Sequence, residues 1–274
     1  MQRAAGKTVL VTGSTDGVGR VVARRLGAAG ARVLVHGRDP DRGESVVRDI
    51  RGEGGAADFL SADFCSLAEV RRLADTVQAQ QTRLDILVNN AGTTTVTREV
   101  CPAGHELCFT VNYLAGFLLS RLLLPLLARS APARIVNVAS AGQQALDFEN
   151  IMLTRDFSGL RAYRQSKLAQ ILFTIDLARE IAGSEVSVNA LHPATFMNTT
   201  MVRRAGVQPT SSVNAGADAI LNLAVSPELD GRSGLYFEGL REARAAPQAY
   251  DEAARRRLRD LSLELTAQYL RRAP

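Results

Sequence analysis

The sequence predicts an α/β fold in which a parallel sheet carries helices on both faces. Short β-branched apolar runs alternate with longer segments of helical periodicity along the whole chain, and this alternation is typical of parallel strands joined by crossover helices. The 274 residues are 46% hydrophobic, which is enough for one substantial core. Because the sequence contains no internal repeat, low-complexity tract or linker, we expect one domain over residues 1–274.

The expected elements follow in order. The first three strands are placed at residues 7–12, 31–36 and 56–61, with helices after each. The fourth to seventh strands are placed at 84–88, 134–138, 185–191 and 235–237. Further helices are expected at about 103–128, from Tyr163 to about residue 182, and at 212–225 and 247–270. The result is a doubly wound sheet of seven strands.

A glycine-rich turn, TGSTDGVG at residues 12–19, lies between the first strand and the first helix. In this position glycines let the backbone approach a pyrophosphate, and the helix N-terminus supplies free amides and the positive end of its dipole. The turn therefore predicts a dinucleotide cofactor. The residues assigned to it are Gly13, Ser14, Thr15, Asp16, Gly17, Val18 and Gly19.

The end of the second strand indicates which dinucleotide is bound. A carboxylate there would hold the adenosine ribose hydroxyls, but this chain has Gly37 and Arg38. A guanidinium without a carboxylate favours a 2′-phosphate, so we expect NADP(H) in preference to NAD(H). Asp39 and Pro40 are predicted to be the N-cap and first position of the next helix.

Two further strand ends are candidates for the adenosine side of the cofactor. Asp63, with Phe64, ends the third strand and either contacts the adenine amino group or caps the helix that starts near Ser66. After the fourth strand, small and amide side chains suit a turn packed beside adenosine; these residues are Asn90, Ala91 and Gly92.

Four polar residues predict acid/base chemistry. Tyr163 and Lys167 are four residues apart on a predicted helix, so their side chains leave the same face. A nearby cation lowers the pKa of a tyrosine below about 10. Ser140 follows the fifth strand, at the sheet edge where ligands bind in open α/β sheets. Asn112 lies inside a helix, where asparagine is unfavourable, which suggests a specific role.

Composition excludes several classes. The net charge is +5, but the arginines are scattered and form no basic tract, so nucleic-acid binding is not expected. Cys65, Cys101 and Cys108 are too few and too irregular for a disulfide framework, which favours a reducing, cytoplasmic location. The three histidines lie far from one another and from any cysteine cluster, so no metal site is expected.

No membrane anchor is expected. The N-terminus leads directly into a strand, without a signal peptide. The apolar run at 114–127 is interrupted by Arg121 and Pro125 and is too short to span a bilayer. It is predicted to be a buried or interface helix.

In their order and spacing, these motifs resemble the short-chain dehydrogenase/reductase family over residues 7 to about 240. The resemblance adds NNAG at 89–92, YxxxK at 163–167 and a Pro-Ala-Thr segment at 193–195, and it implies a Rossmann fold. It also implies that Tyr163 is the general acid/base, that Ser140 stabilises the substrate oxygen, and that Lys167 lowers the tyrosine pKa and binds the nicotinamide ribose. Asn112 would hold a water that links Lys167 to solvent. Pro193 and Thr195 would contact the nicotinamide.

The long connection between Ser140 and Tyr163, with HGRD at 36–39, resembles the retinol-dehydrogenase-like and protochlorophyllide-reductase-like branch. That branch implies NADP(H) and hydrophobic carbonyls or alcohols. We expect a substrate pocket formed by residues 93–97, 143–157 and 196–207, with a lid near 195–212. The family also implies a homodimer or homotetramer. Its candidate apolar contacts, which could instead be buried within one subunit, are Leu118, Leu122, Ile171 and Phe173.

The resulting functional hypothesis is an NADP(H)-dependent oxidoreductase that interconverts a carbonyl and an alcohol on a small, largely hydrophobic substrate. One alternative is an epimerase or dehydratase that retains a tightly held cofactor. Another is a cofactor-binding regulatory protein that has lost catalysis. The intact set of Asn112, Ser140, Tyr163 and Lys167 argues against that last alternative.

Overall fold

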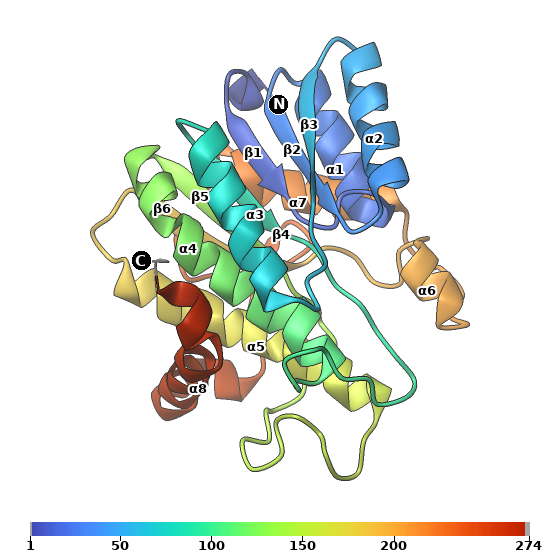
Figure 1. Cartoon of the computed structure of the whole chain (residues 1–274), viewed down its shortest axis with the longest axis vertical. Helices are drawn as coiled ribbons and strands as arrows, with labels where there is room; N and C mark the ends of the chain where they lie inside the picture. Colours follow the sequence, from blue (N-terminus) through green and yellow to red (C-terminus); the bar gives the residue numbers. More distant parts are fainter. Residues whose placement is uncertain (1, 272–274) are drawn as a thin grey trace.

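The structure is a computed structural model and describes residues 2–271. Its centre is one eight-stranded sheet with the order β3-β2-β1-β4-β5-β6-β7-β8 (Figure 1). Strands β1 to β7 pair in parallel, whereas β8 pairs antiparallel with β7. The strands are β1 (Thr8–Val11), β2 (Arg32–Gly37), β3 (Ala56–Ser61), β4 (Ile86–Asn89), β5 (Ala133–Val138), β6 (Val186–His192), β7 (Tyr236–Glu238) and β8 (Arg241–Ala243).

The predicted doubly wound α/β class is confirmed, but the predicted count of seven strands is one too low. Strand β8 has only three residues, which is too short for a period-two pattern to be recognised in sequence. A two-residue connection that begins with Gly239, at φ +60°, joins β8 to β7. Strands β7 and β8 therefore form a β-hairpin at the edge of the sheet.

Helices cover both faces of the sheet (Figure 1). Leu10 of β1 belongs to the core shared with α3, α4, α5 and α8, whereas Val9 and Val11 belong to the core shared with α1, α2 and α7. This alternation is the period-two pattern of a strand buried on both faces. The helices are α1 (Gly17–Ala28), α2 (Pro40–Gly52), α3 (Leu67–Gln80), α4 (Ala115–Arg129), α5 (Gly159–Glu180), α6 (Thr200–Arg204), α7 (Val213–Val225) and α8 (Glu252–Leu270). The shorter turns are η1 (Gln2–Ala4), the π-helical η2 (Phe109–Leu114), η3 (Pro227–Leu229) and η4 (Pro247–Tyr250).

The helix expected from about residue 103 begins later than predicted. Val100 and Glu106 form an isolated antiparallel bridge, so the preceding residues make a loop. The Glu106 carboxylate accepts hydrogen bonds from the backbone amides of Cys108 (2.9 Å) and Phe109 (2.7 Å). A side chain that satisfies free amides in this way fixes the start of a helix.

Residues 109–129 form a continuous helix of 21 residues whose length and composition would suit a membrane span, longer than the sequence suggested. However, 67% of its most apolar window is buried inside the protein. Arg121 in its middle pairs with Glu180 of α5 at 2.6 Å. The packing is therefore that of a core helix, as predicted.

Helix α8 packs against α4 and α5 (Figure 1). The Tyr113 hydroxyl is 2.7 Å from the Ser262 hydroxyl, and Arg259 pairs with Asp176 at 3.0 Å. The four candidate oligomer contacts are accordingly buried or half-buried within the subunit: Leu118, Leu122, Ile171 and Phe173. A homo-oligomer remains a prediction.

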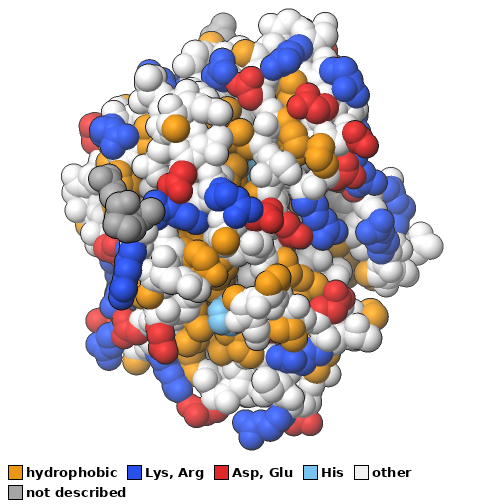
Figure 2. Space-filling model, viewed as in Figure 1, with side chains coloured by type: hydrophobic (Ala, Val, Ile, Leu, Met, Phe, Trp, Pro, Cys, Tyr) orange, Lys and Arg blue, Asp and Glu red, His pale blue; other side chains and the backbone are white. Residues whose placement is uncertain are grey.

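Figure 2 shows basic side chains dispersed over this face of the molecule, with acidic side chains between them. Many of the arginines form ion pairs, among them Arg257 with Glu149 and Arg71 with Asp75. The positive net charge therefore gives no continuous basic field on this face, in agreement with the scattered arginines in the sequence.

Candidate active site

The predicted glycine turn forms a tight cradle at the carboxyl end of β1. Gly13 and Gly17 have φ values of +62° and +54°, which side-chain-bearing residues rarely adopt. A Cβ on Gly19 would lie 2.4 Å from both Asn90 Nδ2 and the Gly13 carbonyl oxygen. Only glycine lets helix α1 start so close to the turn, so these residues fit a bound pyrophosphate.

Thr12 ties this turn to the end of β4. Its Oγ1 accepts hydrogen bonds from the backbone amides of Asn90 (2.9 Å) and Ala91 (3.0 Å). In return, Asn90 Nδ2 donates to the Thr12 carbonyl at 2.8 Å. The glycine turn and the NNAG segment, which were assigned to the same cofactor, are therefore one hydrogen-bonded unit.

The remaining residues of the turn have separate roles. Ser14 Oγ donates to the Val11 carbonyl at 2.7 Å, which closes the turn. Asp16 caps α1 by accepting from the Gly17 amide at 2.7 Å. The Val18 side chain is buried in the core, and the Thr15 side chain packs against Gly37. Of these residues, Val18 therefore offers a cofactor only its backbone.

His36 is a structural residue that the sequence reasoning missed. Its Nδ1 accepts from the Gly13 amide at 3.1 Å, its Nε2 is 3.2 Å from the Ala62 carbonyl, and its ring stacks on Phe64 with 4.4 Å between centroids. Burial lowers the pKa of His36 to about 4, so the ring is neutral. The sequence signal for this role was the position of His36 at the end of a buried strand, just before Gly37.

Arg38 and Asp39 lie as predicted at the end of β2. The Asp39 side chain accepts from the Arg42 amide at 3.1 Å and caps α2, which confirms its role as N-cap. The Arg38 side chain is exposed and has no acidic partner within 4 Å in residues 2–271. The guanidinium is therefore available for an anionic ligand beside the glycine turn.

Asp63 does not cap the following helix, because Ser66 does so by accepting from the Glu69 amide. Asp63 Oδ1 instead accepts from the Cys65 amide at 2.9 Å. The Phe64 side chain is buried against His36, so only its backbone could reach a cofactor. Of the two roles considered for Asp63, the contact to adenine is the one that remains.

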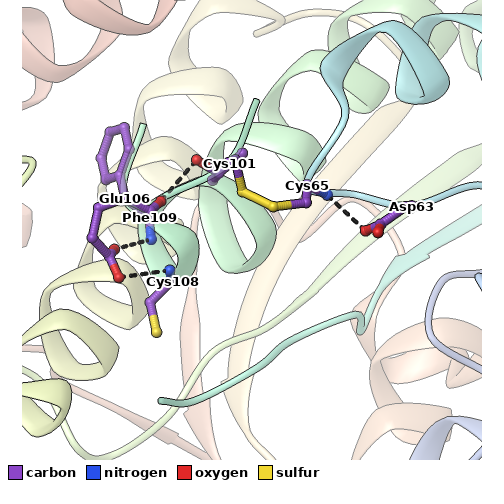
Figure 3. The surroundings of a disulfide bond; sticks show 7 residues. Asp63, Cys65, Cys101, Glu106, Cys108 and Phe109 are labelled. Carbon is purple, nitrogen blue, oxygen red and sulfur yellow. Dashed lines mark hydrogen bonds between the residues drawn. A yellow bond between two sulfur atoms is a disulfide. The ribbon is translucent and has the colours of Figure 1, made fainter. Parts of the chain in front are cut away.

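A disulfide joins Cys65 to Cys101, with 5.2 Å between the two Cα atoms. Figure 3 shows that it links the segment after β3 to the loop that leads into η2. The expectation of unpaired cysteines was wrong for two of the three, because partners 36 residues apart meet only after folding. Cys108 is the free, buried thiol. Cysteine usage therefore no longer supports a reducing compartment.

The structure brings Ser140, Tyr163 and Lys167 together as the sequence predicted. The Ser140 side chain is hydrogen-bonded to the Tyr163 hydroxyl, and both residues are partly exposed. Lys167 Nζ lies 5.7 Å from the centre of the Tyr163 ring and donates hydrogen bonds to the Val138 carbonyl (2.8 Å) and to Gln170 Oε1 (3.0 Å). Strand β5 and helix α5 thus position one acid/base group.

The charge states differ from the expectation. Burial raises the pKa of Tyr163, and the hydrogen bond to Ser140 opposes that rise without cancelling it. Burial lowers the pKa of Lys167 to about 8. The predicted lowering of the tyrosine pKa by Lys167 is therefore not observed, since the ammonium is directed to Val138 and Gln170. At neutral pH the tyrosine is a protonated acid, suited to donate to a substrate oxygen.

Asn112 lies in the π-helical η2, and both the oxygen and the nitrogen of its side chain form hydrogen bonds. Its Oδ1 accepts from the Thr93 amide at 2.6 Å, and its Nδ2 donates to the Thr93 carbonyl (3.1 Å) and to Ser166 Oγ (2.8 Å). Such π-turns frequently mark functional sites. The asparagine inside the helix thus has specific contacts, whereas a water held between Asn112, Lys167 and solvent stays a prediction. It fixes the segment after Gly92 next to α5.

The predicted lid lies against the glycine turn. Thr199 caps α6 and approaches the Cβ position of Gly17 to 3.4 Å, and the Thr200 side chain is hydrogen-bonded to Asp16. Pro193 is buried, whereas Thr195 is exposed and its Oγ1 lies 3.0 Å from His192 Nε2. Figure 1 shows α6 projecting from the body of the molecule, below α2 in this view.

The long connection before Tyr163 has no helix of its own and is held by the C-terminal segment. Leu146 exchanges two hydrogen bonds with the Gln248 side chain, at 2.7 and 3.1 Å. The guanidinium of Arg257 lies 4.9 Å from the centre of the Phe148 ring. We call this connection the substrate-side loop after its predicted role, and it is attached to η4 and α8 by these contacts. Within residues 2–271, no group of three or more His, Cys, Asp or Glu residues could hold a metal.

Comparisons with known proteins agree with this geometry. A family model described as short chain dehydrogenase matches residues 7–209. Human retinol dehydrogenase 13 is 38% identical over 273 residues, which cover 92% of this chain and 82% of that protein. Mouse retinol dehydrogenase 14 is 37% identical over 284 residues, with coverages of 94% and 85%.

Solved structures give the same result. An uncharacterised protein from Mycobacterium paratuberculosis is 30% identical with a TM-score of 0.81, and the match covers 96% of this chain and 94% of that one. The NADP complex of RhlG from Pseudomonas aeruginosa is 30% identical with a TM-score of 0.72, over 86% and 96% of the two chains. The chain therefore belongs to the short-chain dehydrogenase/reductase family, in the branch that resembles the retinol dehydrogenases.

Proposed function

We propose that the chain is an NADP(H)-dependent oxidoreductase that interconverts a carbonyl and an alcohol on a small, largely hydrophobic substrate. The observation that carries the proposal is the contact between the Tyr163 hydroxyl and the Ser140 side chain. Tyr163 lies on α5, one helical turn before Lys167. The relatives named as retinol dehydrogenases support an apolar alcohol or aldehyde. The exposed Arg38, beside a cradle that fits a pyrophosphate, supports the phosphorylated dinucleotide.

In this proposal the nicotinamide supplies or accepts the hydride, and the protein moves the proton. Tyr163 donates its proton to the substrate oxygen during reduction and takes it back during oxidation. Ser140 donates a hydrogen bond to the same oxygen and stabilises the charge that develops there. Lys167, held at the far side of Tyr163, is the group through which the phenol regains its proton.

The test is a panel of apolar aldehydes and ketones with NADPH, and of the matching alcohols with NADP+, each repeated with the unphosphorylated cofactor. Retinal and retinol belong in the panel because of the relatives' names. Turnover of at least one pair with preference for NADP(H) is expected. Tight cofactor binding without any net oxidation or reduction would favour a regulatory protein, or an epimerase or dehydratase.

A further inference from the structure

Gln170 is a buried residue of α5 that contacts the proposed acid/base machinery and has no assigned role. It lies three residues after Lys167 and is 4% exposed. Its Oε1 accepts a hydrogen bond from Lys167 Nζ at 3.0 Å, and the Val138 carbonyl accepts a second at 2.8 Å. An ammonium has three donors, so these two acceptors leave one N–H for the site.

Gly92 indicates where the third N–H of the Lys167 ammonium can point. A Cβ on Gly92 would lie 3.6 Å from Lys167 Nζ and 3.4 Å from Asn112 Oδ1. The ammonium therefore faces the turn that was assigned to the cofactor. Gln170 is bonded to the same ammonium.

The main chain of α5 at Gln170 is joined to β5 by two buried hydrogen bonds. Thr174 Oγ1 donates to the Gln170 carbonyl at 2.8 Å, and Asn137 Nδ2 donates to Thr174 Oγ1 at 2.8 Å. Asn137 directly precedes Val138 on β5. The main chain of the helix at Gln170 and the strand that carries the Val138 carbonyl are thus linked by buried hydrogen bonds.

We propose that Gln170 is a positioning residue that holds the Lys167 ammonium in place and keeps it protonated at the pH of the reaction. The inference deepens the proposed function and rests on it. Lys167 is 5% exposed, and no carboxylate in residues 2–271 lies within ion-pair distance of its Nζ. The positive charge must therefore be stabilised by neutral acceptors.

The other groups around Lys167 do not replace this acceptor. Tyr163 lies on the same helix and is protonated, because burial raises its pKa. Burial raises the pKa of Cys108, which lies before η2, to about 12, so the thiol is neutral. Burial also lowers the pKa of His192 at the end of β6, which favours a neutral ring. Of these groups only Cys108 would raise the pKa of Lys167 through its charge, and its thiol is neutral near pH 8 because its own pKa is about 12.

The sequence makes a direct test possible, because the chain has only two lysines, Lys7 and Lys167. Protein labelled with ¹³C at lysine Cε should give two resonances, and Lys7→Arg assigns them. The pKa of Lys167 can then be measured by NMR titration without cofactor or substrate. In the unaltered chain the titration is expected near pH 8.

Three variants separate the proposed role from general packing. Gln170→Leu keeps the volume without the acceptor and should lower the pKa of Lys167 by about one unit. Gln170→Glu keeps the acceptor, adds a charge and should raise the pKa by about one unit or more. Gln165→Leu is the matched control: Gln165 lies on the same helix, is also 4% exposed and donates to Ala145 at 2.7 Å without contacting Lys167. Its lysine titration should match that of the unaltered chain.

The same shifts should appear in the pH dependence of kcat/KM, where the limb due to Lys167 moves with the measured pKa. A Lys167 titration unchanged in Gln170→Leu, or shifted equally in Gln165→Leu, would overturn the role of Gln170. If Gln170→Leu does not fold, an unshifted titration in Gln170→Glu overturns it instead. Failure of the unaltered chain to turn over any substrate counts against the proposed function alone, because the NMR titration needs no activity.

Discussion

The hydroxyl of Tyr236 donates a hydrogen bond to the main-chain carbonyl oxygen of Ser140 over 3.2 Å. Gln143 Nε2 donates to the same oxygen at 3.1 Å, and Tyr236 is buried. The peptide that carries the proposed oxyanion-stabilising serine is therefore held by two side chains, one from β7 and one from the substrate-side loop.

Tyr236→Phe should lower kcat about five- to tenfold, because one neutral hydrogen bond is worth about 1 kcal/mol. The affinity for NADPH should not change, since Tyr236 contacts the serine peptide and not the glycine turn. Steady-state kinetics and a fluorescence titration of NADPH measure the two effects. Tyr269→Phe on α8 is the matched control; an equal loss of kcat in both variants would contradict a local role for Tyr236.

Tyr163→Phe should reduce turnover by about 10²- to 10⁴-fold, the usual contribution of a general acid. The ring remains, so NADPH should bind nearly as before. The assay pairs the rate of NADPH oxidation with a binding titration on the same protein. Turnover that persists at the original rate would remove Tyr163 from the proposed mechanism.

Arg38→Ala should weaken NADPH about 10- to 100-fold, because hydrogen bonds to a charged group contribute about 1.5–3 kcal/mol. NADH lacks the 2′-phosphate and should lose about twofold at most. Dissociation constants for both cofactors give the comparison, with the exposed Arg48→Ala on α2 as control. If Arg38→Ala weakens both cofactors equally, the guanidinium does not recognise the phosphate.

His36 should make the protein less stable in acid. Its pKa in the folded protein is about 4, below its ordinary value of 6.5, so protonation favours the unfolded chain. The contribution is complete above pH 6.5 and falls as the pH drops from 6.5 towards 4, by up to about 3 kcal/mol at about 1.4 kcal/mol per unit. Urea unfolding across this range should show a shallower pH dependence for His36→Gln. Identical slopes would mean that His36 titrates normally.

The Cys65–Cys101 disulfide should stabilise the fold. By the loop-entropy argument, a crosslink across about 36 residues restricts the unfolded chain by about 4 kcal/mol. Reduction should therefore lower the Tm of the unaltered protein and leave Cys65→Ser unaffected. Thiol titration in denaturant without reductant should detect one reactive cysteine, Cys108; detection of three would show that the disulfide does not form.

The sequence was informative where function requires a particular residue at a particular place. Gly13 and Gly17 need positive φ, and Asp39 is followed by proline at the start of a helix. Tyr163 and Lys167 are related by one helical turn. Each of these signals depends on neighbours along the chain, so each could be recognised before the fold was known.

The residues that sequence reasoning missed act through contacts between distant segments. His36 joins the glycine turn to the end of β3, and Gln170 acts through a lysine on its own helix and a carbonyl on β5. Cys65 and Cys101 come from separate loops. Burial also raises the pKa of Tyr163, and the cation four residues away is not among the groups that shift it. Such effects require the three-dimensional arrangement.

The contacts of η4 and α8 with the substrate-side loop have a consequence for attempts to change substrate specificity. The loop's conformation depends on Gln248, which forms two hydrogen bonds with the backbone of Leu146, and on Arg257, whose guanidinium lies over the Phe148 ring. Directed evolution of substrate range in this enzyme should therefore include the last thirty or so positions of the chain, although they are remote in sequence from the reacting groups. Changes in these residues would alter the predicted substrate pocket without altering Tyr163, the proposed proton donor.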